Sequence, residues 1–313
     1  MSKKNKIKNW QQLFFLVWTL LAVQELRAWT AGPIKNGSDP WQEQLLAERK
    51  QKDSEFKNSV TSPMAGSVRL TISSGAKTFV VEKNGAVDIS NQAMPGSFFA
   101  VFAKNGGWVW SDGAAGVTCR TQDRDVAPGK ELLPPGSLFQ VGRLTMAAYP
   151  APDSLALIVY DPLRPQLLDF KHLYYFPPEP RYAVTAHLEK FPVSREVKIL
   201  TTRKLEKTFY RYARIRFIID GREFMLTAFK SSLSGADDEM LFIPFKDSTN
   251  GRETYEVGRF LEISEPQQAE FILNFNRCFN PLCNYSPAYN CPLPPLENFL
   301  DVAIRAGEKV YPH

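Results

Sequence analysis

Residues 214–229 read RIRFIIDGREFMLTAF, and this stretch decides the fold class. Two runs rich in β-branched and aromatic residues flank the dipeptide Asp220-Gly221. Asp-Gly between two such runs is a strong signal of a β-hairpin, because the central residues of its tight turn need positive φ angles. We therefore predict an antiparallel hairpin here.

Similar short runs, separated by Gly, Pro, Asn and Asp, extend from the hairpin toward both ends of the chain. They start at Val68, Lys77, Ser97, Gly107, Leu138 and Leu155 in a first series, and at Tyr182, Glu196, Arg214, Glu223 and Glu239 in a second. Many short strands with turn signals between them are typical of sandwiches and barrels. We predict an all-β, mainly antiparallel fold with two β regions.

The chain has 313 residues, of which 44% are hydrophobic, and this is enough for two modest cores. The segment 161–166 contains Pro162 and Pro165 and reads as a linker. We predict a signal peptide at 1–31, a spacer and helix at 32–64, an N-terminal β domain at 65–166 and a C-terminal β domain at 167–313.

Apolar residues recur at near-helical spacing from Trp41 to Phe56, which predicts one amphipathic helix. Asp39 is its expected N-cap and Pro40 its first residue. The charge-rich stretch 48–53 is expected to be a solvated face.

Four lysines within the first eight residues precede the apolar run 13–23. The run is too short to span a membrane as a helix and is typical of a signal peptide, with cleavage after Ala28 or Ala31. We predict an exported, periplasmic or extracellular protein without a transmembrane segment in its mature form; an uncleaved signal anchor is the alternative. Those lysines account for much of the net charge of +5, so nucleic acid is not an expected partner.

Export permits disulfides, and the chain has four cysteines. Seven residues rich in turn formers separate Cys283 from Cys291, so a local disulfide between them is our favoured interpretation. The pairing of Cys119 and Cys278 stays open. A zinc site built from Cys278, Cys283 and Cys291 is the alternative, although its spacing is unusual and no His lies nearby. We predict no metal and no cofactor.

The block 242–309 is unusually dense in Asn, Pro, Tyr and Cys. One hypothesis is that Asp247, Tyr255 and Arg259 converge on a pocket as a base, a hydroxyl donor and an anion clamp. The alternative is that the polar residues of 247–251 only cap backbone amides in a turn. A calcium loop is a third option, although the spacing differs from that of known helix-loop-helix sites.

Polar residues alternate with apolar ones from Leu273 to Asn280, which predicts a strand whose polar side faces a cavity or a wet interface. Its amides either hold a ligand or satisfy the backbone of the proline-rich loop that follows. Glu297 and Asn298 close this loop, and a carboxylate held against Pro and aromatic residues would suit acid–base chemistry. His172 and His187 lie in β-type runs, where a lone His is usually structural.

Three stretches carry a resemblance to a known family: PFKDSTNGRETYEVGRFL at 244–261, NFNRCFNPLCNYSPAYNCPLPPLENFL at 274–300 and AIRAGEK at 303–309. They resemble the DUF1684 family, an uncharacterised group of bacterial and often exported proteins. The resemblance is strong over 41–64 and 169–309 and loose over 65–166. The loose region is faintly similar to a forkhead-associated domain, but it lacks the pattern of a phosphothreonine reader.

The resemblance implies a set of polar residues that belong together, but it brings no established activity. Carried onto this sequence, the family's motif falls on Asp247, Thr249, Asn250, Gly251, Thr254, Tyr255, Gly258, Arg259, Asn276, Asn280, Pro281, Cys283, Cys291, Pro292, Glu297 and Asn298. Cys278 departs from the small residue usual at its position, so the resemblance does not support a pairing that involves it.

Three hypotheses on function follow. The first is a secreted or periplasmic β-rich binding protein for a small polar or anionic ligand, with a site made of Asp247, Thr249, Asn250, Tyr255, Arg259, Asn276, Asn280, Glu297 and Asn298. The second is a structural or envelope-interaction protein with a protein partner in the cell envelope. The third is an acid–base hydrolase with Asp247 and Glu297 as its carboxylate pair and Tyr255 as an oxyanion donor. Sequence alone leaves open whether the chain is an enzyme.

Overall fold

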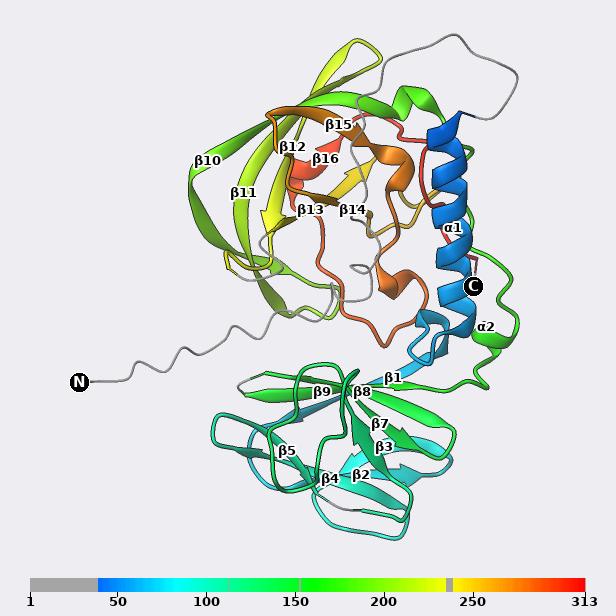
Figure 1. Ribbon diagram of the computed structural model, residues 1–313, viewed down its shortest axis with the longest axis vertical. Helices are drawn as coiled ribbons and strands as arrows, with labels where there is room; N and C mark the ends of the chain where they lie inside the picture. Colours follow the sequence, from blue (N-terminus) through cyan, green and yellow to red (C-terminus); the bar gives the residue numbers. More distant parts are fainter. Residues whose placement is uncertain (1–38, 112, 152, 235–238, 313) are drawn as a thin grey trace, which may run out of the picture. The chain divides into compact units, whose positions relative to one another are not determined.

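The computed structural model describes residues 39–111, 113–151, 153–234 and 239–312 (Figure 1). The fold is mainly antiparallel β with one long helix, α1 (Pro40–Asn58), as predicted. The predicted signal peptide lies outside the described residues. No helix in the described part of the chain has both the length and the apolar character needed to cross a membrane.

The chain divides into two compact units, which we describe separately. Among the described residues, the first unit comprises 55–171 and 282–291, and the second comprises 39–54, 172–281 and 292–312. The division therefore falls after Lys171, whereas the sequence placed it after residue 166. The loop 282–291 belongs to the first unit, although the prediction assigned all of 167–313 to one domain.

The first unit consists of two antiparallel sheets. One sheet has the order β1-β9-β8-β7-β6 and the other β3-β2-β4-β5. The strands are β1 (Gly66–Ser73), β2 (Thr78–Lys83), β3 (Ala86–Ser90), β4 (Ser97–Lys104), β5 (Gly107–Ser111), β6 (Thr118–Arg120), β7 (Ser137–Val141), β8 (Leu144–Pro150) and β9 (Ser154–Tyr160). Phe99 stacks on Phe139 at 4.2 Å between ring centroids, and Trp110 meets Phe139 edge-on at 5.6 Å. These aromatic contacts form the centre of this unit's core.

The second unit consists of one strongly curved sheet with the order β14-β13-β12-β11-β10-β15 (Figure 1). A short strand, β16, pairs in parallel with β13. The strands are β10 (Ala183–Leu200), β11 (Glu206–Ile219), β12 (Arg222–Lys230), β13 (Met240–Asp247), β14 (Arg259–Ser264), β15 (Glu270–Asn274) and β16 (Phe299–Leu300). Their inward residues, among them Ile215, Leu226 and Ile243, form the main core of the unit.

The predicted hairpin is confirmed. Ile219 pairs with Arg222, and Asp220 and Gly221 form the turn with φ angles of 50° and 74°. Positive φ at both turn positions matches the right-handed twist of the flanking strands.

The runs that start at Tyr182 and Glu196 were expected to be two strands, but they belong to the single long strand β10. Its pairing with β11 shifts register between Lys190 and Arg195, and the pairing of β11 with β12 shifts between Arg211 and Ala213. Pro192 falls in the first irregularity, where a missing N–H costs no ladder bond. Bulges of this kind increase local twist and bend a strand. The long hairpin therefore curves within one sheet.

The Asn298 side chain lies between two strands of this sheet, β12 and β13, and binds both. Strands β12 and β13 pair only at Phe229 and Phe242, and beyond that point they separate. The Asn298 side chain accepts a hydrogen bond from the N–H of Thr227 at 2.7 Å and donates to the carbonyls of Thr227 at 2.9 Å and Pro244 at 2.7 Å. One buried amide thus replaces the missing backbone ladder.

Helix α1 corrects the expectation of a solvated charged face. Arg49 is 9% and Lys52 is 7% exposed, because helical spacing places them on the same side as buried Leu45. Arg49 donates to the carbonyls of Phe176 and Asn276, and Lys52 binds Glu308 at 2.6 Å. Asp53 accepts from the N–H of Leu173. The charges of this stretch tie the helix to the second unit.

The predicted strand from Leu273 to Asn280 is also wrong. Strand β15 ends at Asn274, and a 3-10 turn covers Phe275–Arg277. The Asn274 side chain accepts from the N–H of Asn276, so it caps the turn and ends the strand. His172, unlike His187, lies outside the strands.

Candidate functional site

Asp247 and Arg259, the predicted centre of the site, form a closed ion pair. The Arg259 Nη2 lies 2.6 Å from Asp247 Oδ2, and both side chains are 0% exposed. Arg259 also donates to the carbonyl oxygens of Ile304 at 2.7 Å, Ala306 at 2.5 Å and Glu308 at 3.3 Å. These carbonyls belong to the segment 304–308, which we call the C-terminal strap. The guanidinium therefore binds the protein's own backbone, which argues against a role as an anion clamp for a ligand.

The charge of Arg259 is secure in this setting. Burial lowers the pKa of the guanidinium, but the nearby Cys278 and Asp247 outweigh burial, so the net shift of the pKa is upward. Because Arg259 stays charged and binds three carbonyls and one carboxylate, its role is to stabilise the structure.

The turn after Asp247 is an internal hydrogen-bond network. Asp247 Oδ1 accepts from the N–H of Thr249 at 2.8 Å and from its hydroxyl at 2.6 Å. Asn250 accepts from the N–H of Asp247 at 2.7 Å and donates to the carbonyl of Tyr255 at 2.6 Å. Gly251 has a φ of 78°. These contacts match the capping alternative, and they engage the Asp247, Thr249 and Asn250 side chains proposed for ligand binding.

The other predicted amides also bind backbone groups. Asn276 exchanges two hydrogen bonds with the backbone of Glu179, at 2.8 and 2.9 Å. Asn280 donates to the carbonyl of Lys309 at 2.8 Å, and Asn298 bridges β12 and β13 as described above. All three residues are 1% exposed or less. Their role is to satisfy irregular backbone.

The carboxylate pair of the hydrolase hypothesis does not form. Glu297 lies at the surface and binds Arg211 through both oxygens, at 3.1 and 2.6 Å, with 37% of its side chain exposed. Asp247 is fully enclosed and binds Arg259. Because each carboxylate is held by a different arginine, one at the surface and one in the interior, the two do not face one cavity. The geometry thus argues against this mechanism.

Cys283 and Cys291 lie close together in the first unit. The backbone N–H of Cys283 donates to Sγ of Cys291 at 3.2 Å. No disulfide joins them in this structure, so the disulfide stays a prediction. The loop is also fixed by Ser286, whose hydroxyl donates to the carbonyl of Gly66 at 2.7 Å.

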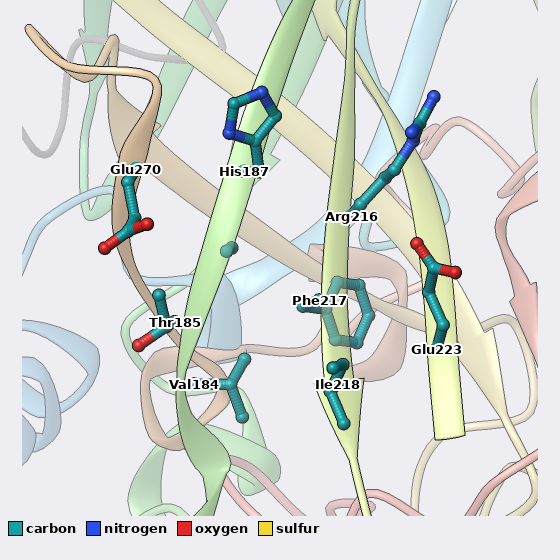
Figure 2. Close-up of a pocket in the computed structure, with 9 residues that line it drawn as sticks. Val184, Thr185, His187, Arg216, Phe217, Ile218, Glu223 and Glu270 are labelled. Atoms are coloured by element: carbon teal, nitrogen blue, oxygen red, sulfur yellow. The ribbon is translucent and has the colours of Figure 1, made fainter. Parts of the chain in front are cut away.

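A hollow of about 510 Å³ lies elsewhere, on the sheet of the second unit (Figure 2). It is lined by Val184, Thr185, Ala186, His187, Arg216, Phe217, Ile218, Glu223 and Glu270, which come from β10, β11, β12 and β15. Glu270, His187 and Arg216 are direct neighbours across three strands. Ile218 is 61% exposed, and Ile272, the cross-strand partner of Thr185, is 57% exposed. The hollow combines exposed apolar surface with both signs of charge.

Sequence reasoning missed this hollow and treated His187 as a structural residue. The signal was weak, because polar residues that alternate with apolar ones are the ordinary outer face of a strand. Ile218 and Ile272 depart from that pattern because they are apolar and exposed. The sequence does not show that they point outward, because their direction depends on strand register and on the bulges.

Two further titratable groups lie in the second unit. Burial raises the pKa of Glu262 to about 7, although Lys52 and Lys207 lower it. Glu262 pairs across the sheet with Phe242, which stacks on Phe209 at 5.3 Å and meets Phe260 edge-on at 4.9 Å. The aromatic surroundings thus favour the neutral carboxyl.

Glu265 has the opposite character. Burial raises its pKa, but hydrogen bonds from Lys190, Lys230 and Tyr212 outweigh burial and lower the pKa to about 2. Lys230 lies 2.6 Å from Glu265, and the Tyr212 hydroxyl donates to it at 2.7 Å. This cluster connects β10, β11 and β12 to the end of β14 through one carboxylate.

Comparison with known proteins places these features in a family. Residues 168–309 match the family described as "Protein of unknown function (DUF1684)". Among the solved structures that match is the solution NMR structure of an uncharacterized protein of Haloarcula marismortui, with 33% sequence identity, 48% of this chain and 82% of that chain covered, and a TM-score of 0.40. The chain belongs to the DUF1684 family. No curated protein matches the chain.

The DUF1684 region contains every strand from β10 to β16 as well as the loop 282–291. Both the Asp247–Arg259 network and the hollow therefore lie within it. The first unit's two sheets precede the region. Family membership confirms the recognition made from the sequence and leaves the activity to be inferred from geometry.

We expect Arg259→Ala to destabilise the DUF1684 fold by about 3–5 kcal/mol, because it leaves the Asp247 carboxylate buried without its partner. The double variant Asp247→Leu with Arg259→Met should lose less, since it leaves no charge uncompensated. Urea unfolding measures both. Arg305→Ala is the matched control, because Arg305 is 55% exposed and pairs with Glu253 at the surface. An Arg259→Ala variant as stable as the wild type would show that the ion pair does not hold the strap.

We expect Glu262→Gln to change the pH dependence of stability. The ordinary pKa of a Glu carboxyl is 4.5, and the pKa of Glu262 in the folded protein is about 7. Between these two pH values the folded state retains a proton that the unfolded state releases. This group's favourable contribution is thus complete below pH 4.5 and is lost as pH rises to 7.

The Gln variant should therefore have a higher melting temperature than the wild type at pH 8 and a similar one at pH 4. Thermal unfolding at several pH values measures the difference, with Glu256→Gln, which removes an exposed carboxyl, as control. A difference that stays constant with pH would contradict the assigned pKa.

Proposed function

We propose that this chain is an exported binding protein that takes an amphipathic ligand with an anionic group in the hollow of its curved sheet. The observation that carries the proposal is the hollow itself. Its volume of about 510 Å³ lies within the range of small-molecule sites. The ligand position differs from the one expected from the sequence, because Asp247 and Arg259 bind each other.

The lining of the hollow supports the chemistry of this ligand. Ile218, which is 61% exposed, supplies apolar contact for the body of a ligand, whereas Val184, Ala186 and Phe217 belong to the buried core beneath the hollow. Arg216 and His187 supply donors for an anionic group. Arg216 already binds Glu189 at 3.0 Å, but the two side chains are 48% and 53% exposed, so this pair is weak enough to be exchanged for a ligand.

The binding test uses 8-anilinonaphthalene-1-sulfonate, a probe with an apolar body and a sulfonate. We expect saturable binding that weakens by about tenfold or more in Ile218→Glu, because the new carboxylate repels the sulfonate and removes apolar contact. The control is Leu205→Glu, the same change at a residue of similar exposure, 53% against 61%, on the turn between β10 and β11. Equal binding by both variants would show that the probe does not occupy the hollow.

Export rests on the sequence of the first 31 residues. The lysines before the apolar run 13–23 and the small residues Ala28 and Ala31 support cleavage by a signal peptidase. When the full chain is expressed in a bacterium, the mature protein should be recovered outside the cytoplasm, with a new N-terminus after Ala28 or Ala31. Recovery of the intact chain from the cytoplasm would overturn this part of the proposal.

The alternative function is a structural or envelope-interaction protein. The observation that favours it is that the Asp247, Thr249, Asn250, Asn276, Asn280 and Asn298 side chains all satisfy groups of the chain itself. The probe experiment separates the two functions. A hollow that takes no amphipathic probe leaves the elaborate turn network as a scaffold for a protein partner.

A further inference from the structure

A second feature of the sheet in the second unit has no role in the hollow. At the irregularity between β10 and β11, Lys190 pairs with Ala213 but Arg195 pairs with Arg211. Like charges directly opposite each other on two strands repel and destabilise a sheet. A pair of this kind calls for negative charge between or beside the two guanidinium groups.

A third arginine faces the same side. On β12, Phe229 is the partner of Arg211 and Thr227 is the partner of Arg214. Phe229 and Thr227 are two residues apart, and residues two apart on a regular strand point to one face of the sheet. Their partners Arg211 and Arg214 therefore share that face. Both rest on the Phe191 ring, with guanidinium carbons 4.4 and 5.2 Å from its centroid. The ring holds the two planar groups in defined positions.

The nearby carboxylates neutralise only part of this cluster. Glu297 binds Arg211, and Glu189, the cross-strand partner of Arg214, binds Arg216. Within the described residues, neither Arg195 nor Arg214 forms an ion pair with a carboxylate. The Nε of Arg214 is buried and has no hydrogen-bond partner. Guanidinium groups that no carboxylate of the protein neutralises favour an oxyanion as ligand.

We infer that Arg195 and Arg214, with Arg211 as the third cation, form a binding site for a phosphate group. Guanidinium groups bind phosphate oxygens through paired, charge-assisted hydrogen bonds. The phosphate belongs either to a lipid headgroup at a membrane surface or to a soluble phosphate compound. The inference does not rest on the ligand proposed for the hollow, because the two sites use different arginines.

The test uses the mature full-length protein and two probes. Inorganic phosphate is titrated by calorimetry, and sedimentation compares vesicles of phosphatidylcholine alone with vesicles that also contain phosphatidic acid. Binding of the phosphate ion identifies a soluble ligand, whereas binding only of phosphatidic acid vesicles identifies a headgroup. The inference is overturned when neither probe binds.

Three variants locate the site. The double variant Arg195→Ala with Arg214→Ala should bind the successful probe at least about tenfold more weakly. The double variant Lys198→Ala with Lys204→Ala is the matched control, because it also removes two positive charges from the same hairpin. Alternation with Val197 places Lys198 on the opposite face from Arg195, and Lys204 lies in the turn between β10 and β11. An equal loss in the control would overturn the site, because it would mean that only net charge matters.

Glu297→Gln supplies a test with the opposite sign. Glu297 competes with an incoming anion for Arg211, so its neutralisation should tighten binding of the same probe by about threefold or more. A merely structural role of the cluster would not produce tighter binding. Weaker binding by this variant would contradict the assignment of Arg211 to the site.

Discussion

The buried pair of Asp247 and Arg259 is the interaction on which the second unit depends. Both side chains are fully enclosed, and a charge enclosed in this way is tolerable only when every strong partner is in place. Arg259 meets this condition by donating to carbonyls at alternate positions of the strap, residues 304, 306 and 308. The guanidinium thus supplies the strap with the hydrogen-bond donors that a neighbouring strand would supply in a sheet.

The strap carries the effect of that pair to other parts of the unit. Ile304 and Ala306, which are 0% exposed, join the main core. Gly307 has a φ of 71°, and a Cβ at this position would lie 2.4 Å from the carbonyl oxygen of Cys278, so only glycine fits. Glu308 then accepts from Lys52 of α1 at 2.6 Å and from the N–H of Asn280 at 2.7 Å. One ion pair therefore fixes the strap, and the strap fixes the helix.

The sequence predicted those parts of the fold whose cause is local. The Asp220-Gly221 turn, the start of α1 at Pro40 and most strand runs follow from residues within a few positions of each other. Asn298 shows where such reasoning ends, because its partner Thr227 lies 71 residues away in sequence. The same holds for Lys52 and Glu308 at 256 residues. Nothing in the local pattern of α1 distinguishes a lysine that reaches a buried carboxylate from one that faces water.

The partners of the polar residues in the block 242–309 could not be predicted for a related reason. A dense set of Asn, Asp and Arg residues indicates specific geometry, but the sequence does not say whether these groups face a ligand or each other. Here irregular backbone, rich in proline and short 3-10 turns, needs many side-chain partners, and the polar block supplies them. The two binding sites that we propose lie on the outer face of the long strands, where His187, Arg195 and Arg216 are exposed.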